Sequence, residues 1–402
     1  MLRYINSRSL RGWCGALLVA GAAVVGLADD AAAACRGAWA EGVNYAAGDT
    51  VTYNGSVYTA RVAHGCNGCG WNPVAAASLW LQGGTCAGAG TPTPTPRPGG
   101  PTPTPTPTSR PIPPGARIFA PYLDTDVAMN QGFDLANNMG SVSRMYTLSF
   151  ILGRGCTPAW MGHSELNSSI GNMWGNQINA LRARGGDVIV AFGGAAAPEL
   201  AESCFNVTQL QAAYQAVVSR YNLRYIDLDI ESFGNLDNRS RALAGLQRAN
   251  PNLRIHFTLG VLESGLTAPQ ISVLNSAKSA GLRVDLVNIM AMDYGHPVSN
   301  MGAAAISAAQ GTRAQLNSLG MNSTQIGITP MIGQNDSAGE VFTLGNAQST
   351  VSWARSNGVA LMGFWSIGRD NGGCPNNRTA SATCSGVSQS TFQFSSAFRA
   401  FP

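Results

Sequence analysis

Charged residues are scarce in this sequence. Lysine, arginine, aspartate and glutamate make up 11% of its 402 residues, where a typical soluble domain carries about 25%. The formal net charge is +4, and no basic run or stripe is present. We therefore expect neither a nucleic acid nor an anionic membrane as a partner, and the composition favours a neutral polar ligand. Because 45% of the residues are hydrophobic, disorder throughout the chain is also excluded.

The sequence also lacks an apolar run long enough to span a bilayer, which takes about 20 residues. The longest one, from Trp13 to Ala28, follows three arginines and precedes small residues ending at Ala34. This order is typical of a secretory signal peptide, so we expect residues 1–34 to be removed and the mature protein to be extracellular, with no membrane attachment. Cys35 stands where a lipoprotein acceptor would, but two aspartates interrupt that pattern, and we favour a disulfide role.

The chain has nine cysteines, and Cys14 lies in the predicted signal peptide. An even number then remains in an exported protein, which indicates disulfides. The Cys66-x-x-Cys69 motif also allows zinc binding or thiol exchange, but His64 is its only close histidine and no second such motif follows. The pairs that we expect are Cys35–Cys86, Cys66–Cys69, Cys156–Cys204 and Cys374–Cys384, although spacing alone does not fix the connectivity.

Proline occupies nearly every second position from 91 to 114. Such a segment has few backbone donors and favours an extended polyproline conformation, so it acts as a semi-rigid spacer. We therefore divide the mature chain into a small module at 35–88, a Pro/Thr-rich linker at 89–115 and a large domain at 116–402.

The small module is rich in aromatic residues and has too few residues for a large core. Alternation over residues 48–60, with Asn54-Gly55 at the centre, predicts a β-hairpin. Exposed aromatic rings stack on sugar rings, whereas buried ones form the core. The candidates for binding a polysaccharide are Trp39, Tyr58, Trp71 and Trp80. For Trp39, Tyr45 and Trp80, the core is the favoured interpretation.

The stretch AWAEGVNYAAGDTVTYNGSVYTA, followed by Asn72-Pro73 and Trp80, resembles the chitin-binding modules of carbohydrate-binding families 5 and 12. The resemblance covers nearly the whole module and implies binding to chitin. The sequence departs from these families after the hairpin, where Arg61-Val62-Ala63 replaces a pair of exposed aromatic residues. Trp71 is the candidate to replace that platform.

The large domain contains eight short apolar runs rich in valine, isoleucine and phenylalanine, separated by segments such as TQLQAAYQAVVSRYN with helical character. This alternation predicts an α/β fold of parallel strands joined by helices, and eight repeats indicate a (β/α)8 TIM barrel. An open doubly wound sheet is the alternative. It is disfavoured because no glycine fingerprint of the nucleotide-binding type follows the first run.

The fourth run, residues 225–231, alternates apolar and acidic residues. Asp227, Asp229 and Glu231 therefore share one face of a strand, with their carboxyls about 6–7 Å apart. In a dry site at least one of them should hold a proton near neutral pH, and a protonated glutamate can act as a general acid on a glycosidic oxygen. A metal site with Asp293 as a further ligand is the weaker alternative. A solvated strand face is improbable in a strand covered on both sides.

The motif D-x-D-x-E, with FGG on an earlier run, MAMDYG on the sixth, TPMIG on the seventh and FWS on the last, resembles glycoside hydrolase family 18, the chitinases, and within it a bacterial and archaeal subgroup. The resemblance implies Glu231 as the general acid and base, Asp229 holding the substrate acetamido group, Asp227 tuning Asp229, and no metal or cofactor. Substrate contacts are expected from Trp365, Met290, Asp293, Gln334, Tyr122 and Phe192.

The sequence departs from this family at two places. Arg224 stands where the family often has a further aspartate, and Met292 stands where many members have a tyrosine that contacts the acetamido oxygen. Tyr294 lies two residues further on and would share that face if the strand continued, so we expect it to supply the hydroxyl. Few residues separate the seventh and eighth runs, which leaves no room for an added lobe and favours a shallow cleft.

These observations predict a secreted, monomeric chitinase that hydrolyses β-1,4 bonds between N-acetylglucosamine units. We expect it to be mainly endo-acting and retaining, with an oxazolinium intermediate formed by the substrate's own acetamido group. The alternatives are an endo-β-N-acetylglucosaminidase acting on other glycans and a non-catalytic chitin-binding lectin.

Overall fold

The computed structural model describes residues 35–40, 43–54, 56–62, 64, 72–74, 76, 78–83, 116–196 and 198–402. The chain forms two compact units, Met1–Thr102 and Pro103–Pro402, which are treated separately below. The predicted signal peptide, nearly all of the predicted linker, Trp71, and the pairs Cys35–Cys86 and Cys66–Cys69 lie outside the described residues or side chains.

The N-terminal unit contains a small sheet in the order β1 (Cys35–Ala38), β2 (Thr50–Tyr53), β3 (Ser56–Ala60) and β4 (Trp80–Gln82). Strands β2 and β3 pair antiparallel around Asn54, as predicted for the hairpin, and Asn54 has a positive φ of 49°. Tyr45, Val51, Ala60 and Trp80 form the core of this unit. With so few core residues, the aromatic rings supply most of the buried surface.

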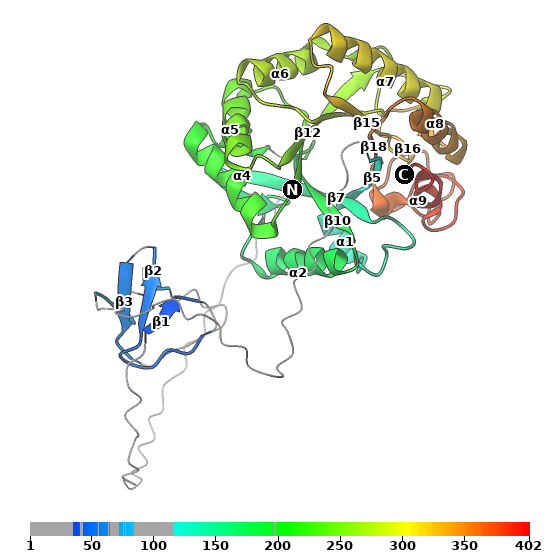
Figure 1. The fold of residues 1–402 in the computed structure, drawn as a ribbon. Coiled ribbons are helices and arrows are strands. Elements are labelled where there is room, and N and C mark those ends of the chain that lie inside the picture. Colours follow the sequence, from blue (N-terminus) through cyan, green and yellow to red (C-terminus); the bar gives the residue numbers. More distant parts are fainter. Residues whose placement is uncertain are drawn as a thin grey trace, which may run out of the picture. The chain divides into compact units, whose positions relative to one another are not determined.

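The C-terminal unit has a mixed α/β fold (Figure 1). Its parallel strands are β5 (Ile118–Phe119), β6 (Tyr122–Asp124), β7 (Met145–Arg154), β10 (Asp187–Gly193), β11 (Tyr225–Ile230), β12 (Arg254–Leu262), β14 (Leu286–Met290), β15 (Gln325–Thr329) and β18 (Leu361–Met362). Parallel pairing runs from β18 through β15, β14, β12, β11 and β10 to β7, with β5 beside β18 and β6 beside β7. Each strand begins within one of the eight predicted apolar runs, with β5 and β6 in the same run, and β7 and β12 extend one or two residues beyond theirs.

Helices lie outside these strands (Figure 1). They are α1 (Thr125–Asn130), α2 (Ser169–Ala183), α3 (Leu200–Ser203), α4 (Val207–Tyr221), α5 (Leu236–Ala249), α6 (Ala268–Ser279), α7 (Met301–Ser318), α8 (Leu344–Ser356), the 3₁₀ turn η1 (Ile367–Arg369) and α9 (Gln393–Phe398). Helix α4 matches its predicted segment, and the Asn206 side chain caps it by accepting from the backbone N–H of Gln209. Among the described residues, none of these helices combines the length and apolar character needed to cross a bilayer.

The strands bury two distinct faces. One set of alternate residues, including Ile226 and Leu228, packs against the helices in the main core. The other set, including Met145, Ile189 and Leu286, forms a separate cluster on what is called the inner face below. This division follows from the two-residue period of a strand, and it decides which polar side chains can meet.

Three short hairpin elements were not predicted. Strands β8 (Thr157–Trp160) and β9 (Ser164–Glu165) extend the end of β7, β13 (Gly265–Leu266) pairs with β12, and β16 (Gly333–Gln334) pairs with β17 (Val341–Phe342). The segment between β15 and β18 holds only this last hairpin and α8, so no additional lobe is inserted there.

Two of the expected disulfides are present. Cys156 on the β7–β8 turn pairs with Cys204 after α3, and Cys374 pairs with Cys384 in the loop after η1. Both predictions are confirmed.

Candidate active site

Strand β11 carries a graded row of carboxyls. Asp227 and Asp229 are 2% and 5% exposed on the inner face, while Glu231 comes directly after the strand and is exposed. The residues between them, Leu228 and Ile230, are buried in the main core against the helices. The predicted alternation is therefore present, and solvent reaches the row from its Glu231 end.

Asp227 is held by hydroxyl donors from neighbouring strands. Tyr122 Oη donates to Asp227 Oδ2 at 2.7 Å, and Thr258 Oγ1 to Oδ1 at 2.8 Å. Asn288 Nδ2 donates to Thr258 Oγ1 at 3.0 Å, and Thr329 Oγ1 donates to Asn288 Oδ1 at 3.0 Å. Burial raises the pKa of Asp227 to about 7, although the hydrogen bonds that it accepts from Tyr122 and Thr258 lower it.

The next two carboxyls, Asp229 and Glu231, influence each other electrostatically. Asp229 Oδ1 is buried without a hydrogen-bond partner among the described residues. Burial raises the pKa of Asp229 well above its usual range, and the charges of Glu231 and Asp227 raise it further. Partial burial of the Glu231 carboxyl, and then the charge of Asp293, raise the pKa of Glu231. Because two nearby carboxylates repel each other, ionisation of one of these groups disfavours ionisation of the other.

An aromatic wall stands beside this row. The half-buried Trp365 stacks on Phe150, with ring centroids 5.7 Å apart and planes at 21°, and lies 6.0 Å from the ring of Tyr122. Phe150 reaches the inner face because the register between β7 and β10 shifts between Val190 and Phe192. We did not predict Phe150 as a site residue, because a bulge leaves no mark in an apolar run such as SFIL.

Met290 and Asp293 come from the end of β14. Met290 is the last residue of the strand and is half-buried, two positions beyond the inner-face Asn288. Asp293 has a positive φ of 49°, and its Oδ1 accepts from the backbone N–H of Ser337 at 2.8 Å. Burial is the main cause of the raised pKa of Asp293. Both residues lie at the carboxyl end of the strand, where prediction put them.

The expectation for Tyr294 rested on a continuing strand, and that premise is wrong. Strand β14 ends at Met290 and the backbone turns at Asp293, so Tyr294 joins the main core with the helices. Its hydroxyl is buried and has no hydrogen-bond partner among the described residues. Burial, with Glu263 and Glu340 nearby, raises the pKa of Tyr294. The hydroxyl therefore does not face the row of carboxyls.

Phe192 is a second correction. Its side chain is fully buried in the main core, where its ring meets Tyr214 of α4 edge-on at 5.2 Å. The inner-face position beside it belongs to Ala191. A phenylalanine packed against a helix cannot touch a substrate, so the alternation of β10 excludes it from the site.

Gln334 lies in the β16–β17 hairpin, where its side-chain amide donates to the carbonyls of Asn335 and Glu340. Its own carbonyl accepts from Arg369, which also donates to Ile332 O at 3.0 Å and to Ser381 O. Arg369 is buried, which lowers its pKa to about 10. Sequence reasoning missed Arg369, since an arginine in a loop gives no signal that it ties three backbone segments together.

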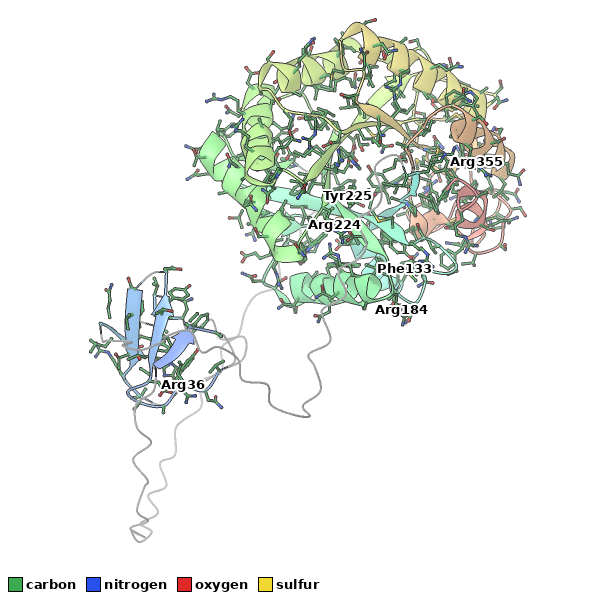
Figure 2. All side chains as sticks on the ribbon, viewed as in Figure 1. Arg36, Phe133, Arg184, Arg224, Tyr225 and Arg355 are labelled. Atoms are coloured by element: carbon green, nitrogen blue, oxygen red, sulfur yellow. A yellow bond between two sulfur atoms is a disulfide. The ribbon has the colours of Figure 1, made fainter. Side chains whose placement is uncertain are left out.

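The two departures from the family pattern have different surroundings. Arg224, labelled in Figure 2 beside Tyr225, lies at the start of β11, at the end remote from Glu231, and its Nε is 3.5 Å from Asp187 Oδ2. It thus joins β11 to β10 away from the reacting groups. Met292 is half-buried in the turn after β14.

In the N-terminal unit, the aromatic candidates divide. Trp80 is buried against Tyr45 and His64, so its ring belongs to the core rather than to a binding face. Trp39 and Tyr58 pack against that core while remaining partly exposed. Of the candidates with described side chains, these two therefore remain available for stacking on a sugar ring.

The residues that the structure describes contain no group of three or more histidine, cysteine, aspartate or glutamate side chains suited to a metal ion. A carboxyl with a raised pKa at the open end of this row, on the same side of the strands as a stacked indole ring, is suited to protonating a glycosidic oxygen. The fold and the site together define a glycoside hydrolase.

Comparison with known proteins specifies the family. The model of carbohydrate-binding module family 5/12 matches residues 38–81. The catalytic domain of the hyperthermophilic chitinase from Pyrococcus furiosus has 34% sequence identity, a TM-score of 0.67, and coverage of 73% of this chain and 97% of that one. The chain belongs to the chitinase family of the glycoside hydrolases, family 18.

Two curated relatives extend this comparison. A probable bifunctional chitinase/lysozyme of Escherichia coli is 32% identical over 288 residues, and Endochitinase 11 of Metarhizium anisopliae is 31% identical over 284 residues; each match covers 63% of this chain. The matches span 31% and 52% of those relatives, so the chain aligns with about a third and about half of their lengths.

Proposed function

We propose that the protein is an exported, monomeric chitinase whose C-terminal unit is a closed (β/α)8 barrel. The pairing of β5 with β18 and of β6 with β7 supports closure, because only Ala120 and Pro121 separate β5 from β6. Active sites of such barrels lie at the carboxyl ends of the strands. Glu231, Asp293 and Trp365 all occupy such ends.

The observation that carries the proposal is the row of three carboxyls on β11, which is buried at Asp227 and Asp229 and ends at the exposed Glu231. In the first step the Glu231 proton moves to the glycosidic oxygen while the substrate's acetamido oxygen attacks the anomeric carbon and the glycosidic bond breaks. An oxazolinium ion results, and Asp229 is placed to accept the acetamido N–H. Water then attacks the same carbon and gives a proton to the Glu231 carboxylate. Two inversions leave the β configuration, and the reaction requires no metal or organic cofactor.

Asp227 adjusts the charge of Asp229 from deeper in the row. Its two hydroxyl donors favour the carboxylate, whereas burial favours the acid. A carboxyl with a pKa near neutrality can take up or release charge as the Asp229 N–H contact forms. Trp365 supplies an apolar surface on which one face of the reacting sugar can stack.

The test compares wild type, Glu231→Gln and the exposed control Glu165→Gln on an acetylated chito-oligosaccharide. Removing a general acid should lower kcat by about 10²–10⁴-fold, while the control should match wild type. Equal activity of wild type and Glu231→Gln would reject this acid. If wild type binds chitin but never cleaves it, the protein is a lectin, and cleavage of other N-acetylglucosamine glycans alone would favour the endoglycosidase.

Two further measurements address the course of the reaction. An initial α-anomer in the proton NMR spectrum of the products would contradict the substrate-assisted mechanism. The short β15–β18 connection supports an open cleft and therefore cutting within chains. Early products of mixed length are expected from long chitin, and uniform dimers released from the ends would contradict the endo assignment.

A further inference from the structure

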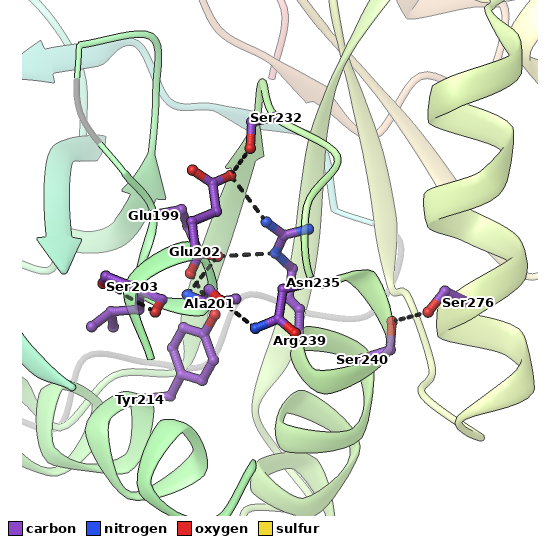
Figure 3. A network of polar contacts seen from close by, with 11 residues as sticks. Glu199, Ala201, Glu202, Ser203, Tyr214, Ser232, Asn235, Arg239, Ser240 and Ser276 are labelled. Carbon is purple, nitrogen blue, oxygen red and sulfur yellow. Dashed lines mark hydrogen bonds and ion pairs between the residues drawn. The ribbon is translucent and has the colours of Figure 1, made fainter. Parts of the chain in front are cut away.

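A buried group of charges lies next to α3 and α5 and takes no part in the proposed chemistry (Figure 3). The side chain of Arg239, on α5, is 1% exposed and lies between two glutamates. Its Nε is 2.9 Å from Glu199 Oε2, and its Nη2 is 3.3 Å from Glu202 Oε1. The two glutamates pair with Nε and Nη2 of Arg239, whereas its Nη1 is buried with no hydrogen-bond partner among the described residues. Because a buried ion is costly unless it is paired, these two ion pairs restrain the position of the side chain.

Glu199 anchors the cluster to the rest of the unit. Tyr214 of α4 donates its hydroxyl to Oε1, and the backbone N–H of Ala201 donates to Oε2 at 3.0 Å. Glu199 is itself buried. It therefore joins the beginning of α3 to α4 through Tyr214 and to α5 through Arg239.

The other end of α3 is also fixed. Cys204 is bonded to Cys156 on the β7–β8 turn, and Ser203 Oγ donates to Gly155 O on the same turn at 2.8 Å. A helix this short has little stability of its own. The disulfide and the ion pairs make α3 a fixed support.

Two hydrogen bonds connect this support to the segment that follows Glu231. The Ser232 hydroxyl donates to Glu202 Oε1, the same oxygen that Arg239 contacts, and Asn235 Nδ2 donates to Ala201 O. Residues 231–234 are exposed, so solvent rather than packing surrounds most of this segment. These contacts restrain the backbone directly after the proposed acid.

We infer that Glu202 and Arg239 are positioning residues of the reaction: Arg239 orients Glu202, and Glu202 holds Ser232 so that the adjacent Glu231 keeps its direction toward the bound sugar. The inference rests on the proposed function of Glu231. Reaction rates respond strongly to the placement of a catalytic group, and a displacement of about 1 Å can cost about 10²-fold. The contacts act on Glu231 through one peptide unit and touch no substrate.

The test uses the full chain and four variants: Ser232→Ala, Glu202→Ala, the double variant, and Ser232→Thr, which keeps the hydroxyl. The matched control is Ser240→Ala on α5, which also loses one serine hydrogen bond, the 2.9 Å contact with Ser276. Arg239 keeps Glu199 as a partner in all of them, so no charge is left unpaired in the interior.

We expect Ser232→Ala and Glu202→Ala to lower kcat on a chito-oligosaccharide by about tenfold with KM changed less than about twofold. The kcat of the double variant should be no lower than that of the less active single variant, because the two substitutions remove the same hydrogen bond between Ser232 and Glu202. Ser232→Thr and Ser240→Ala should retain the wild-type kcat. Variants with a lower Tm but an unchanged kcat, or losses that multiply in the double variant, would overturn the inference.

Failure of the proposed function is seen separately, as absence of turnover by wild type. In that case amide hydrogen exchange still decides whether the contacts restrain the segment. Faster exchange over residues 231–238 in Ser232→Ala and Glu202→Ala, but not in Ser240→Ala, is the expected result. Unchanged exchange in all three variants would reject the restraint itself.

Discussion

Burial distinguishes the three acids of β11, although they are chemically similar and only two residues apart. Asp227 is buried and has donors to both oxygens, Asp229 is buried with Oδ1 unpartnered among the described residues, and Glu231 is exposed at the end of the strand. The deep residue is therefore stabilised in place, the middle one is left to meet a substrate group, and the outer one can exchange its proton with water. The depth of each acid along β11 therefore accounts for its different proposed role.

The buried Asp227 makes stability depend on pH. Its folded pKa of about 7 lies above the value of about 3.9 in an unfolded chain, so the folded state binds the extra proton between these values. The free energy of unfolding of wild type should therefore fall relative to that of Asp227→Asn as pH rises from about 4 to about 7, and level off above. Urea unfolding of both proteins across this range measures the difference; a constant difference would contradict it.

Tyr294 distinguishes the sequence-based assignment, which puts its hydroxyl at the substrate, from the structure, which puts its side chain in the main core. Its hydroxyl is buried with no hydrogen-bond partner in the part of the chain that the structure describes, and removing an unsatisfied hydroxyl costs little or stabilises the fold. We expect Tyr294→Phe to keep kcat within about twofold of wild type and to leave Tm equal or higher. Turnover of a chito-oligosaccharide and thermal unfolding measure this. A loss of kcat as large as that of Glu231→Gln would instead support the sequence-based assignment, in which the Tyr294 hydroxyl contacts the reacting sugar.

At the scale of elements, the sequence predicted the regular parts and missed the irregular ones. Runs rich in valine and isoleucine marked the parallel strands, since β-branched residues favour extended backbone, and strict alternation in 225–231 located the acidic face. The turn at Asp293 and the register shift that turns Phe150 inward depend on contacts between strands, which alternation cannot reveal. Tyr294 was misplaced for this reason. Phe192 was misplaced although the alternation of β10 already directs it toward the helices, and the burial of Trp80 confirms the favoured interpretation of that residue as core.

The two disulfides differ in the length of chain that they close. Cys156 and Cys204 are 48 residues apart and Cys374 and Cys384 only 10. Chain entropy then predicts a stabilisation of about 4 kcal/mol for the first and about 3 kcal/mol for the second. Urea unfolding of Cys156→Ser/Cys204→Ser and Cys374→Ser/Cys384→Ser should show the larger loss for the first pair; the reverse order would mean that local structure, rather than loop closure, dominates.

At the scale of the whole molecule, low charge and two separate units suit an insoluble neutral polymer. A binding module tethered to a catalytic unit raises the local concentration of the enzyme on its substrate without changing the chemistry. Trp39 and Tyr58 offer partly exposed rings for that contact, and ring stacking, unlike ion pairing, is not screened by salt.

Deleting residues 35–115 should therefore lower the rate on insoluble chitin by about tenfold or more, while kcat on a short soluble oligosaccharide stays unchanged. Adsorption of the full chain to chitin should vary little between low and high salt, because the ligand is uncharged. Sedimentation with chitin powder and reducing-end assays measure both. Equal loss of activity on the soluble substrate would mean that the module supports the fold of the catalytic unit rather than its access to the polymer.

Gly193, at the end of β10, lies between Asp229 of the carboxyl row and Glu199 of the buried ion cluster. A Cβ at this position would lie 2.1 Å from the carbonyl oxygen of Asp229 and 3.4 Å from the Glu199 side chain, and its φ is +101°. Alanine is therefore excluded both by contact and by backbone conformation. A search for faster or more stable variants by random mutagenesis should therefore retain glycine at this position.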